Sequence, residues 1–254
     1  MKPKWFGRHL RMKPPEVSLM RLSIALAAPA LLVAGASFAG VRGSGNLRTE
    51  TRDVPSFDAI WVSAGIHATV SVGPRKPIQI EADDNVLELI ETTVRDGVLQ
   101  IGFKRNANIS STHDVRVTIQ APDLHGVGAS AGSEIRGQLA RGDEVELDAS
   151  GGGQVHVRGI EAGELRISGS GGAVIEAQGR ADRASIEMSG GTQVKGGDLA
   201  VKDVRVDGSG GSQAEVRASG QIRGHLSGGS ELHVRGKANS RVATSGGSSV
   251  DFED

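Results

Sequence analysis

A Ser-Gly-Gly phrase that recurs every 18 to 20 residues constrains the fold of this chain more than any other feature. Ala replaces the first Gly in the first copy, and the copies begin at Ser130, Ser150, Ser170, Ser189, Ser209, Ser227 and Ser245. A fixed period of this size is typical of a solenoid, in which each repeat packs against its neighbours in the chain. The repeats therefore predict one coiled architecture for the second half of the sequence.

The residues that follow each serine alternate between apolar and polar. The fifth positions after the serines are apolar in every repeat: Ile135, Val155, Ile175, Val194, Ala214, Leu232 and Val250. The sixth positions are polar in every repeat: Arg136, His156, Glu176, Lys195, Glu215, His233 and Asp251. Such a period of two indicates a strand with one buried and one solvated face.

The residues before each serine show the same period, so each repeat supplies two short strands joined by the Ser-Gly-Gly bend. The third positions before the serines are Val127, Leu147, Ile167, Ile186, Val206, Gly224 and Val242. The prediction is an all-β fold, a parallel β-helix with about 18–20 residues per rung. A sandwich of short antiparallel strands is the alternative, but it gives no reason to keep one serine at the same position in seven repeats.

Residues 1–39 have the pattern of a secretory signal peptide. Basic residues lead into an apolar run over residues 22–36, and Ser37-Phe38-Ala39 provides the small residues that a signal peptidase reads. The run is too short to span a membrane. We expect an exported protein, periplasmic or secreted to the cell surface, that begins near Gly40. Translation from Met1 or from Met20 remains open.

Charge and composition exclude several classes of function. Residues 1–39 contain six of the 29 Lys and Arg and one of the 30 Asp and Glu, so the remaining chain has a net charge of −6. That balance predicts no nucleic-acid partner and no membrane insertion after signal removal. The chain has no cysteine, which excludes disulfides, thiolate metal sites and thiol nucleophiles.

Residues 40–254 are long enough for a single β-helical domain, and we divide them at residue 128. Residues 129–254 form the regular Ser-Gly-Gly rungs, whereas residues 41–128 lack the serine pattern and predict irregular N-terminal coils that close one end of the solenoid. We expect one helical turn after Asp84, a tight turn at Asp96-Gly97 and Trp61 in the core of this cap. The expected strands are residues 46–51, 59–63, 68–72, 78–81, 98–103 and 115–120.

The chain also resembles a known family, and most of the segments that carry the resemblance lie in its first half. The segments that carry the resemblance are Val54–Ile60, Ala82–Leu87, Asp96–Ile101 and Ala121–Leu124, followed by the Ser-Gly-Gly repeats. Together they are similar to the head GIN domain family, described as "putative auto-transporter adhesin" and formerly a domain of unknown function. The resemblance covers residues 41–254. It implies a right-handed β-helix in the bacterial cell envelope and assigns no activity.

Several residues have the form of a catalytic or binding group, and each has a structural explanation. Residues 128–132 spell the Gly-x-Ser-x-Gly motif of a hydrolase, but Ser130 is the first of a ladder and no helix follows it. His156 and His233 are expected four rungs apart, about 19 Å at the usual strand spacing, and cannot share a metal.

The remaining candidates for a catalytic or binding group are carboxylates that face outward and one aromatic residue. Glu176 and Glu215 are separated in the ladder by Lys195, so alternating charge explains them without catalysis. Residues 83–85 lack the spacing of a calcium loop. Trp61 is the one plausible platform for stacking a sugar. We therefore predict no catalytic, cofactor-binding or metal-binding residues, no cofactor and no enzymatic activity.

The predicted function is that of a non-enzymatic cell-envelope protein, an adhesin or scaffold that presents a rigid β-helical surface. Two alternatives remain open. One is a polysaccharide-active or polysaccharide-binding protein. Pairs of carboxylates on adjacent rungs beside a groove would support this alternative. The other is a subunit of an oligomeric envelope complex. The expected partner is an unidentified envelope protein or glycan, with a homo-oligomer through the solenoid ends as a further option.

Overall fold

Strands occupy most of the part of the chain that the computed structural model describes, residues 40–105, 107, 109–110 and 113–253. The first ten elements are β1 (Val41–Arg42), β2 (Leu47–Arg52), β3 (Ala59–Val62), β4 (His67–Val72), β5 (Ile78–Asp83), α1 (Asp84–Leu87), β6 (Ile90–Arg95), β7 (Val98–Phe103), β8 (Ile109–Ser110) and β9 (Arg116–Ala121). The others are β10 (Gly126–Ser130), β11 (Glu134–Gln138), β12 (Gly142–Ser150), β13 (Gln154–Ser170), β14 (Val174–Met188), β15 (Gln193–Gly208), β16 (Gln213–Ala218), β17 (Gln221–Leu226), β18 (Glu231–Arg235), β19 (Asn239–Thr244) and β20 (Ser249–Glu253). The expected signal peptide lies outside the described residues.

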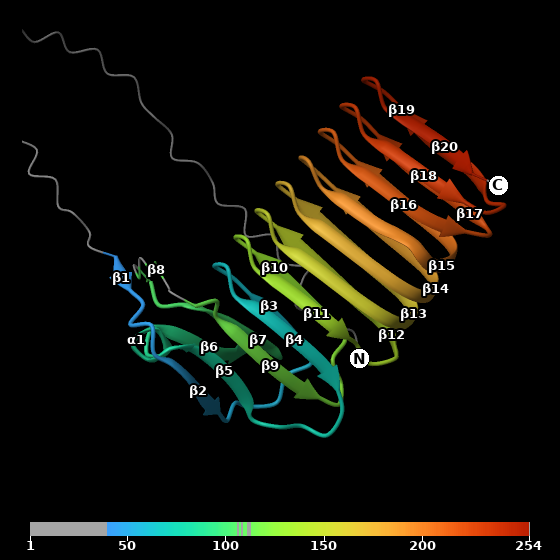
Figure 1. Ribbon diagram of the computed structural model, residues 1–254. Helices are drawn as coiled ribbons and strands as arrows, with labels where there is room; N and C mark the ends of the chain where they lie inside the picture. Colours follow the sequence, from blue (N-terminus) through green and yellow to red (C-terminus); the bar gives the residue numbers. More distant parts are fainter. Residues whose placement is uncertain (1–39, 106, 108, 111–112, 254) are drawn as a thin grey trace, which may run out of the picture. The chain divides into compact units, whose positions relative to one another are not determined.

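Parallel pairing between successive coils confirms the predicted β-helix and excludes the antiparallel sandwich. Each rung places one strand segment on each of two faces (Figure 1). Face 1 consists, in spatial order, of β7, β3, β10, β12, the second halves of β13, β14 and β15, then β17 and β19. Face 2 consists of β9, β4, β11, the first parts of β13, β14 and β15, then β16, β18 and β20.

The core is the predicted ladder of inward side chains. Val155, Ile175, Val194, Ala214 and Leu232 are in register on consecutive rungs and are at most 2 % exposed. Their polar neighbours form a second ladder on the outer surface of face 2, with the same register. The alternation in the sequence thus predicted the direction of every one of these side chains.

The Ser-Gly-Gly bends form a stacked corner. Both glycines of most copies have positive φ, as in Gly171 (+63°) and Gly172 (+80°), a conformation that L side chains rarely adopt. The next residue is small and points inward, and in three bends its hydroxyl donates to the carbonyl of the bend serine: Thr192 to Ser189 at 2.8 Å, Ser230 to Ser227 at 2.8 Å and Ser248 to Ser245 at 2.9 Å. Backbone hydrogen bonds also join neighbouring bends, for example Gly151 N to Ser170 O at 3.2 Å. These contacts explain why the phrase recurs.

One further bend of the same kind escaped the sequence analysis. β3 pairs with β10 and β4 with β11, so that Ser63-Ala64-Gly65 lies directly beside the bend at Ser130. Ala64 and Gly65 have positive φ of 65° and 73°, like the corresponding pair in the next bend. After β4 the chain makes an excursion: it forms β5 and β6, adds β7 beside β3 and β9 beside β4, and then returns to pair β10 with β3 and β11 with β4 on their other edges. That excursion hides the period from any search along the sequence.

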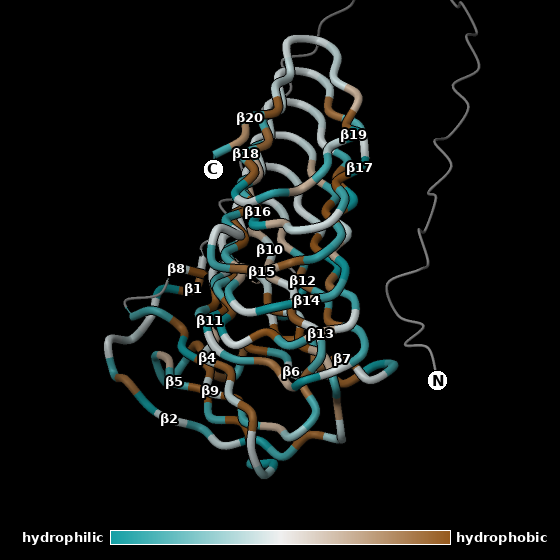
Figure 2. The backbone as a smooth tube through the Cα atoms, turned by 90° about the vertical axis from the view of Figure 1, so that its right-hand side faces the viewer, coloured by the Kyte–Doolittle hydropathy of each residue, from teal (hydrophilic) through white to brown (hydrophobic). Residues whose placement is uncertain are grey.

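The N-terminal end of the solenoid is covered, as predicted. β6 and β7 form an antiparallel hairpin whose turn is Asp96-Gly97, both with positive φ, and β5 runs antiparallel to β9 and to β2. α1 is the expected single turn, although its N-cap is Asp83 rather than Asp84. Apolar residues of this part, among them Ile78, Ile80 and Ile90, join the core cluster. Figure 2 shows β2 and β5 at one end of the stack and β19 and β20 at the other.

The prediction for Trp61 was wrong. Its neighbours Ile60 and Val62 point into the core, and the period of two turns Trp61 to the outer surface of face 1, where it is half-buried. The indole ring lies over Gly128 of the next rung, where an added Cβ would be 2.2 Å from ring atom Cε3. β6 was also missed, although the tight turn expected at Asp96-Gly97 joins it to β7. Among the described residues, no helix has the length and hydropathy needed to cross a membrane.

Candidate functional site

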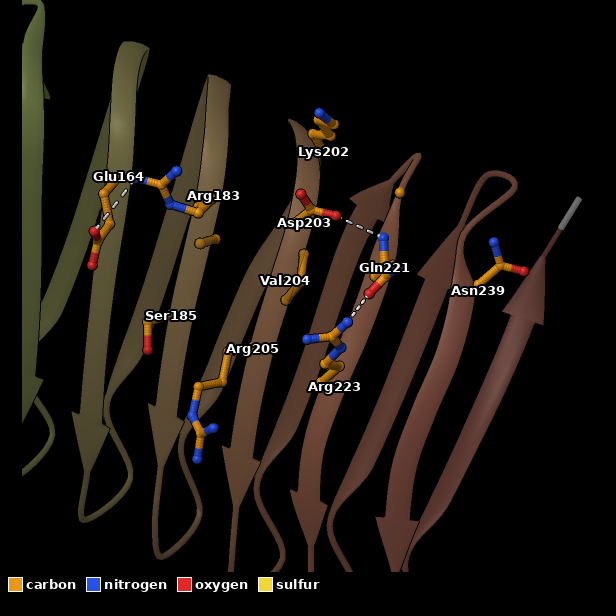
Figure 3. Close-up of a pocket in the computed structure, with 12 residues that line it drawn as sticks. Glu164, Arg183, Ser185, Lys202, Asp203, Val204, Arg205, Gln221, Arg223 and Asn239 are labelled. Atoms are coloured by element: carbon orange, nitrogen blue, oxygen red, sulfur yellow. Dashed lines mark hydrogen bonds and ion pairs between the residues drawn. The ribbon is translucent and has the colours of Figure 1, made fainter.

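The outer surface of face 1 carries two neighbouring grooves. The larger, which we call the basic groove, has a volume of about 810 Å³ and crosses β13, β14, β15, β17 and β19 (Figure 3). Its charged lining residues are Glu164, Arg183, Lys202, Asp203, Arg205 and Arg223. Four cations against two carboxylates make it a local exception in a chain whose net charge after residue 39 is −6.

Parallel register determines the order of the cations in the basic groove. Arg205 pairs with Arg223, and Arg223 with Arg241, so three arginines occupy the same column on consecutive rungs. At about 4.8 Å between neighbouring strands, their stems are as close as strand pairing allows. Like charges directly opposite each other destabilise a sheet. This column therefore differs from the outer surface of face 2, where Glu176, Lys195 and Glu215 alternate in sign.

The groove cations are only partly neutralised by neighbours. Arg205 contacts Asp207 at 2.8 Å, whereas Arg183 reaches Glu164 only at 4.0 Å. Arg223 donates to the side chain of Gln221. Lys202 is exposed and forms no ion pair with any residue that the structure describes. The groove thus has donors for an anionic ligand.

The second groove, which we call the acidic groove, lies nearer the Ser-Gly-Gly bends. Its volume is about 520 Å³, and its charged or titratable lining residues are Asp148, Glu187, Asp207 and His225. Glu187 and Asp207 are partners on adjacent rungs, and His225 follows them in the same column. The Nδ1 atom of His225 lies 3.4 Å from Oδ1 of Asp207. Burial raises the pKa of Asp148 to about 6.

A third charged cluster lies on the outer surface of face 2. Glu134 accepts from His67 Nδ1 at 3.1 Å and lies 3.5 Å from His156 Nε2, while His156 Nδ1 is 3.1 Å from Glu176. Burial acts to raise the pKa of Glu134, but hydrogen bonds from His67 and Arg136 outweigh it and lower that pKa. The hydrogen bond from His156 lowers the pKa of Glu176. This network holds neighbouring rungs together by charge.

The structure places the other sequence candidates in structural roles. Ser130 ends β10 and is followed by a bend and a strand rather than a helix, so the hydrolase motif lacks its required context. Asp83 is fully buried and accepts from His113 Nδ1 at 2.7 Å. No group of three or more His, Asp or Glu among the described residues is arranged to hold a metal ion.

Sequence reasoning missed both grooves of face 1. The signal was present, because Arg205, Arg223 and Arg241 all stand four residues before a serine of the ladder. Aligning the repeats at the fourth position before each serine would have placed these arginines in one column, whereas upstream of the serines only apolar positions were aligned.

Comparison with known proteins identifies the family. Residues 56–238 match the family described as "Putative auto-transporter adhesin, head GIN domain". The chain belongs to this family. The match spans the N-terminal coils from β3 onward and all but the last rung, which agrees with the resemblance noted in the sequence. The family description indicates a protein of the cell surface or exterior.

Solved structures of similar fold come from species of Bacteroides and Parabacteroides and support the same architecture. A protein described as a "putative adhesin" from Bacteroides fragilis NCTC 9343 aligns with a TM-score of 0.76 at 20 % identity, over 84 % of this chain and 100 % of the other. One from Parabacteroides merdae ATCC 43184 aligns with a TM-score of 0.67 at 21 % identity, over 85 % and 99 %. A protein titled as lipid binding, from Parabacteroides distasonis ATCC 8503, aligns with 0.67 at 17 %, over 84 % and 99 %. No curated protein matches the sequence.

Proposed function

We propose that this protein is a non-enzymatic adhesin or scaffold of the bacterial cell envelope that binds an acidic glycan along the basic groove of face 1. The observation that supports the proposal most directly is the column of Arg205 and Arg223, which lie on adjacent rungs with no carboxylate between them. Stability does not explain that column, because like charges on adjacent strands are unfavourable. An extended anionic polymer lying across the rungs would neutralise both.

The chemistry of the groove suits a carbohydrate acid better than a neutral sugar. Its lining combines guanidinium groups with the amides of Gln221 and Asn239, which hydrogen-bond to carboxylates and hydroxyls. Exposed aromatic rings, on which neutral sugars stack, are absent from the groove lining. Export beyond the inner membrane, to the periplasm or surface, would bring the protein to such polymers.

Binding to an immobilised acidic polysaccharide such as polygalacturonate tests the proposal, with dextran as the neutral comparison. We expect the doubly reversed variant Arg205→Glu/Arg223→Glu to bind roughly 10- to 100-fold more weakly, because two charge-assisted hydrogen bonds are lost. The matched control is Arg158→Glu/Arg217→Glu, which makes the same charge change on exposed positions of face 2. Equal weakening in both variants, or no binding of wild type, would contradict a site in the groove.

The description of one structural neighbour as a "putative lipid binding protein" suggests a further arm for this experiment. Vesicles that contain an anionic phospholipid present the same negative charge as an acidic glycan. Binding to the vesicles in preference to the polysaccharide would replace the glycan by a lipid headgroup as the ligand of the groove.

A second candidate function is favoured by the acidic groove. Glu187 and Asp207 lie on adjacent rungs beside a hollow, which is the arrangement expected of a polysaccharide-active β-helix. Neighbouring strands separate such residues by about 4.8 Å, close to the separation of about 5 Å between the two carboxyls of retaining glycosidases. Burial raises the pKa of Asp148 to about 6, so below that pH this residue would supply a protonated acid in the same groove.

Release of reducing ends from acidic polysaccharides distinguishes the two candidates. If the acidic groove is catalytic, wild type shows turnover that Asp207→Asn reduces by about 100-fold or more, while the exposed control Asp198→Asn has no effect. We expect no turnover from any of the three proteins. Turnover that depends on Asp207 would overturn the non-enzymatic proposal.

A further inference from the structure

The last rung of the solenoid leaves an edge of both faces open. β19 pairs with β17 and β20 with β18, and no described strand adds to their other edges. The inward residues Val242 and Val250 are only partly buried, and Phe252 is 50 % exposed, whereas Leu232 one rung earlier is fully buried. The described chain thus presents two adjacent strand edges around an uncovered end of the core.

At the opposite end the core is covered rather than open. β6 and β5 cover β7 and β9 there, and they run antiparallel to the strands they meet. A molecule with one adhesive end forms a closed pair, because a filament requires two different complementary ends.

We propose that two copies of this chain join through their last rungs, with β19 of each copy antiparallel to β20 of the other. A twofold axis parallel to the strands generates this arrangement. It places the Ser245 bends of both copies on the same side, and it unites the two exposed core ends into one continuous core. The partner is a second copy of the chain, and the proposal does not depend on the ligand of the basic groove.

Charge determines which of two twofold arrangements is favoured. The outward residues of β20 include Asp251 and Glu253, whereas the charged outward residue of β19 is Arg241. Pairing must keep inward side chains inward, so Arg241 lies opposite either Asp251 or Glu253 of the other copy. The alternative axis would set β20 against β20 and oppose carboxylate to carboxylate, which is unfavourable.

Arg241 supplies an independent observation in favour of this contact. It is exposed, it forms no ion pair with any described residue, and it stands next to Arg223 in the column of face 1. A carboxylate from a second copy would relieve this accumulation of positive charge. The same contact would satisfy backbone groups of β19 and β20 that have no strand partner.

Charged residues on an edge strand can keep another chain from adding to it, and the acidic residues of this rung would then oppose dimerisation. Their positions argue against it. Glu253 contacts Arg235 at 3.0 Å, and Asp251 lies 3.9 Å from His233, so both side chains stand on the outer surface beside the preceding rung rather than across the open edge.

Sedimentation velocity of the exported protein over a range of concentrations tests the proposal. We expect a monomer–dimer equilibrium that weakens with added salt, because exposed ion pairs are screened. Arg241→Glu should raise the dimer dissociation constant roughly tenfold or more by opposing like charges at two symmetric positions. The triple variant Arg241→Glu/Asp251→Arg/Glu253→Arg exchanges the charges on both strands and should restore the dimer.

Arg158→Glu is the matched control, because it makes the same charge change on an exposed position far from the last rung. It should leave the equilibrium unchanged, and circular dichroism should show that every variant keeps its β structure. A wild type that is monomeric at all concentrations would overturn the proposal. So would a dimer that Arg241→Glu leaves as tight as wild type, or one that the triple variant fails to restore.

Discussion

Val194→Asp is expected to destabilise the whole stack of rungs, by about 3–5 kcal/mol, because it places an unpaired carboxylate in the core. Val194 is 2 % exposed and packs in register between Ile175 and Ala214. Thermal unfolding followed by circular dichroism should show a single transition lowered by about 10 °C or more, or a chain that does not fold. One transition is expected because each rung is stabilised by its neighbours.

Lys195→Ala is the control for this variant, since Lys195 is the next residue and points to solvent between Glu176 and Glu215. Removing an exposed partner should cost less than about 1 kcal/mol. Equal midpoints for the two variants would mean that the strand direction assigned to β15 is wrong.

Gly224→Ala is the second substitution with a large expected effect, although it adds one methyl group. Gly224 lies in β17 beside Val206 with a φ of +148°, and an added Cβ would be 1.7 Å from the Val206 carbonyl oxygen. Neither atom belongs to a flexible side chain, so the two strands must separate. We expect a loss of about 2–4 kcal/mol from strain and overpacking, measured by denaturant unfolding.

Gly191→Ala provides the matched control, because an added Cβ there meets no atom within 4 Å and its φ is not positive. It should change the free energy of unfolding by no more than about 0.5 kcal/mol. If Gly224→Ala were equally mild, the close approach of β17 and β15 at this point would not exist in the folded protein.

The regular half of this fold was predictable because its determinants are local and repeated. A strand with a buried and a solvated face needs alternating side chains, and a tight bend with positive φ needs glycine, so Val194, Lys195 and Gly190 each reveal their position without a structure. The tight turn at Asp96-Gly97 was recognised for the same reason. Repetition at 18 to 20 residues then identified the coil.

Tertiary structure alone decided what depends on which rungs become neighbours. The strands on either side of Ser63 are β3 and β4. In the stack β3 lies between β7 and β10, and β4 lies between β9 and β11, an order that differs from the order along the chain and that no period in the sequence records. Residues 59–62 are all apolar, so the sequence of β3 did not show which of its sides is buried, and the packing of Ile60 and Val62 in the core leaves Trp61 on the outer surface.

The two grooves and the open end have the same origin. Arg205, Arg223 and Arg241 are 18 residues apart in sequence, and pairing of β15 with β17 and of β17 with β19 brings them to adjacent rungs. The alternation of polar and apolar residues determines that these arginines face solvent, because each strand must bury one side. The exact length of every coil then determines which charged residues become neighbours on the outer surface. This is a property of the assembled stack rather than of any one repeat.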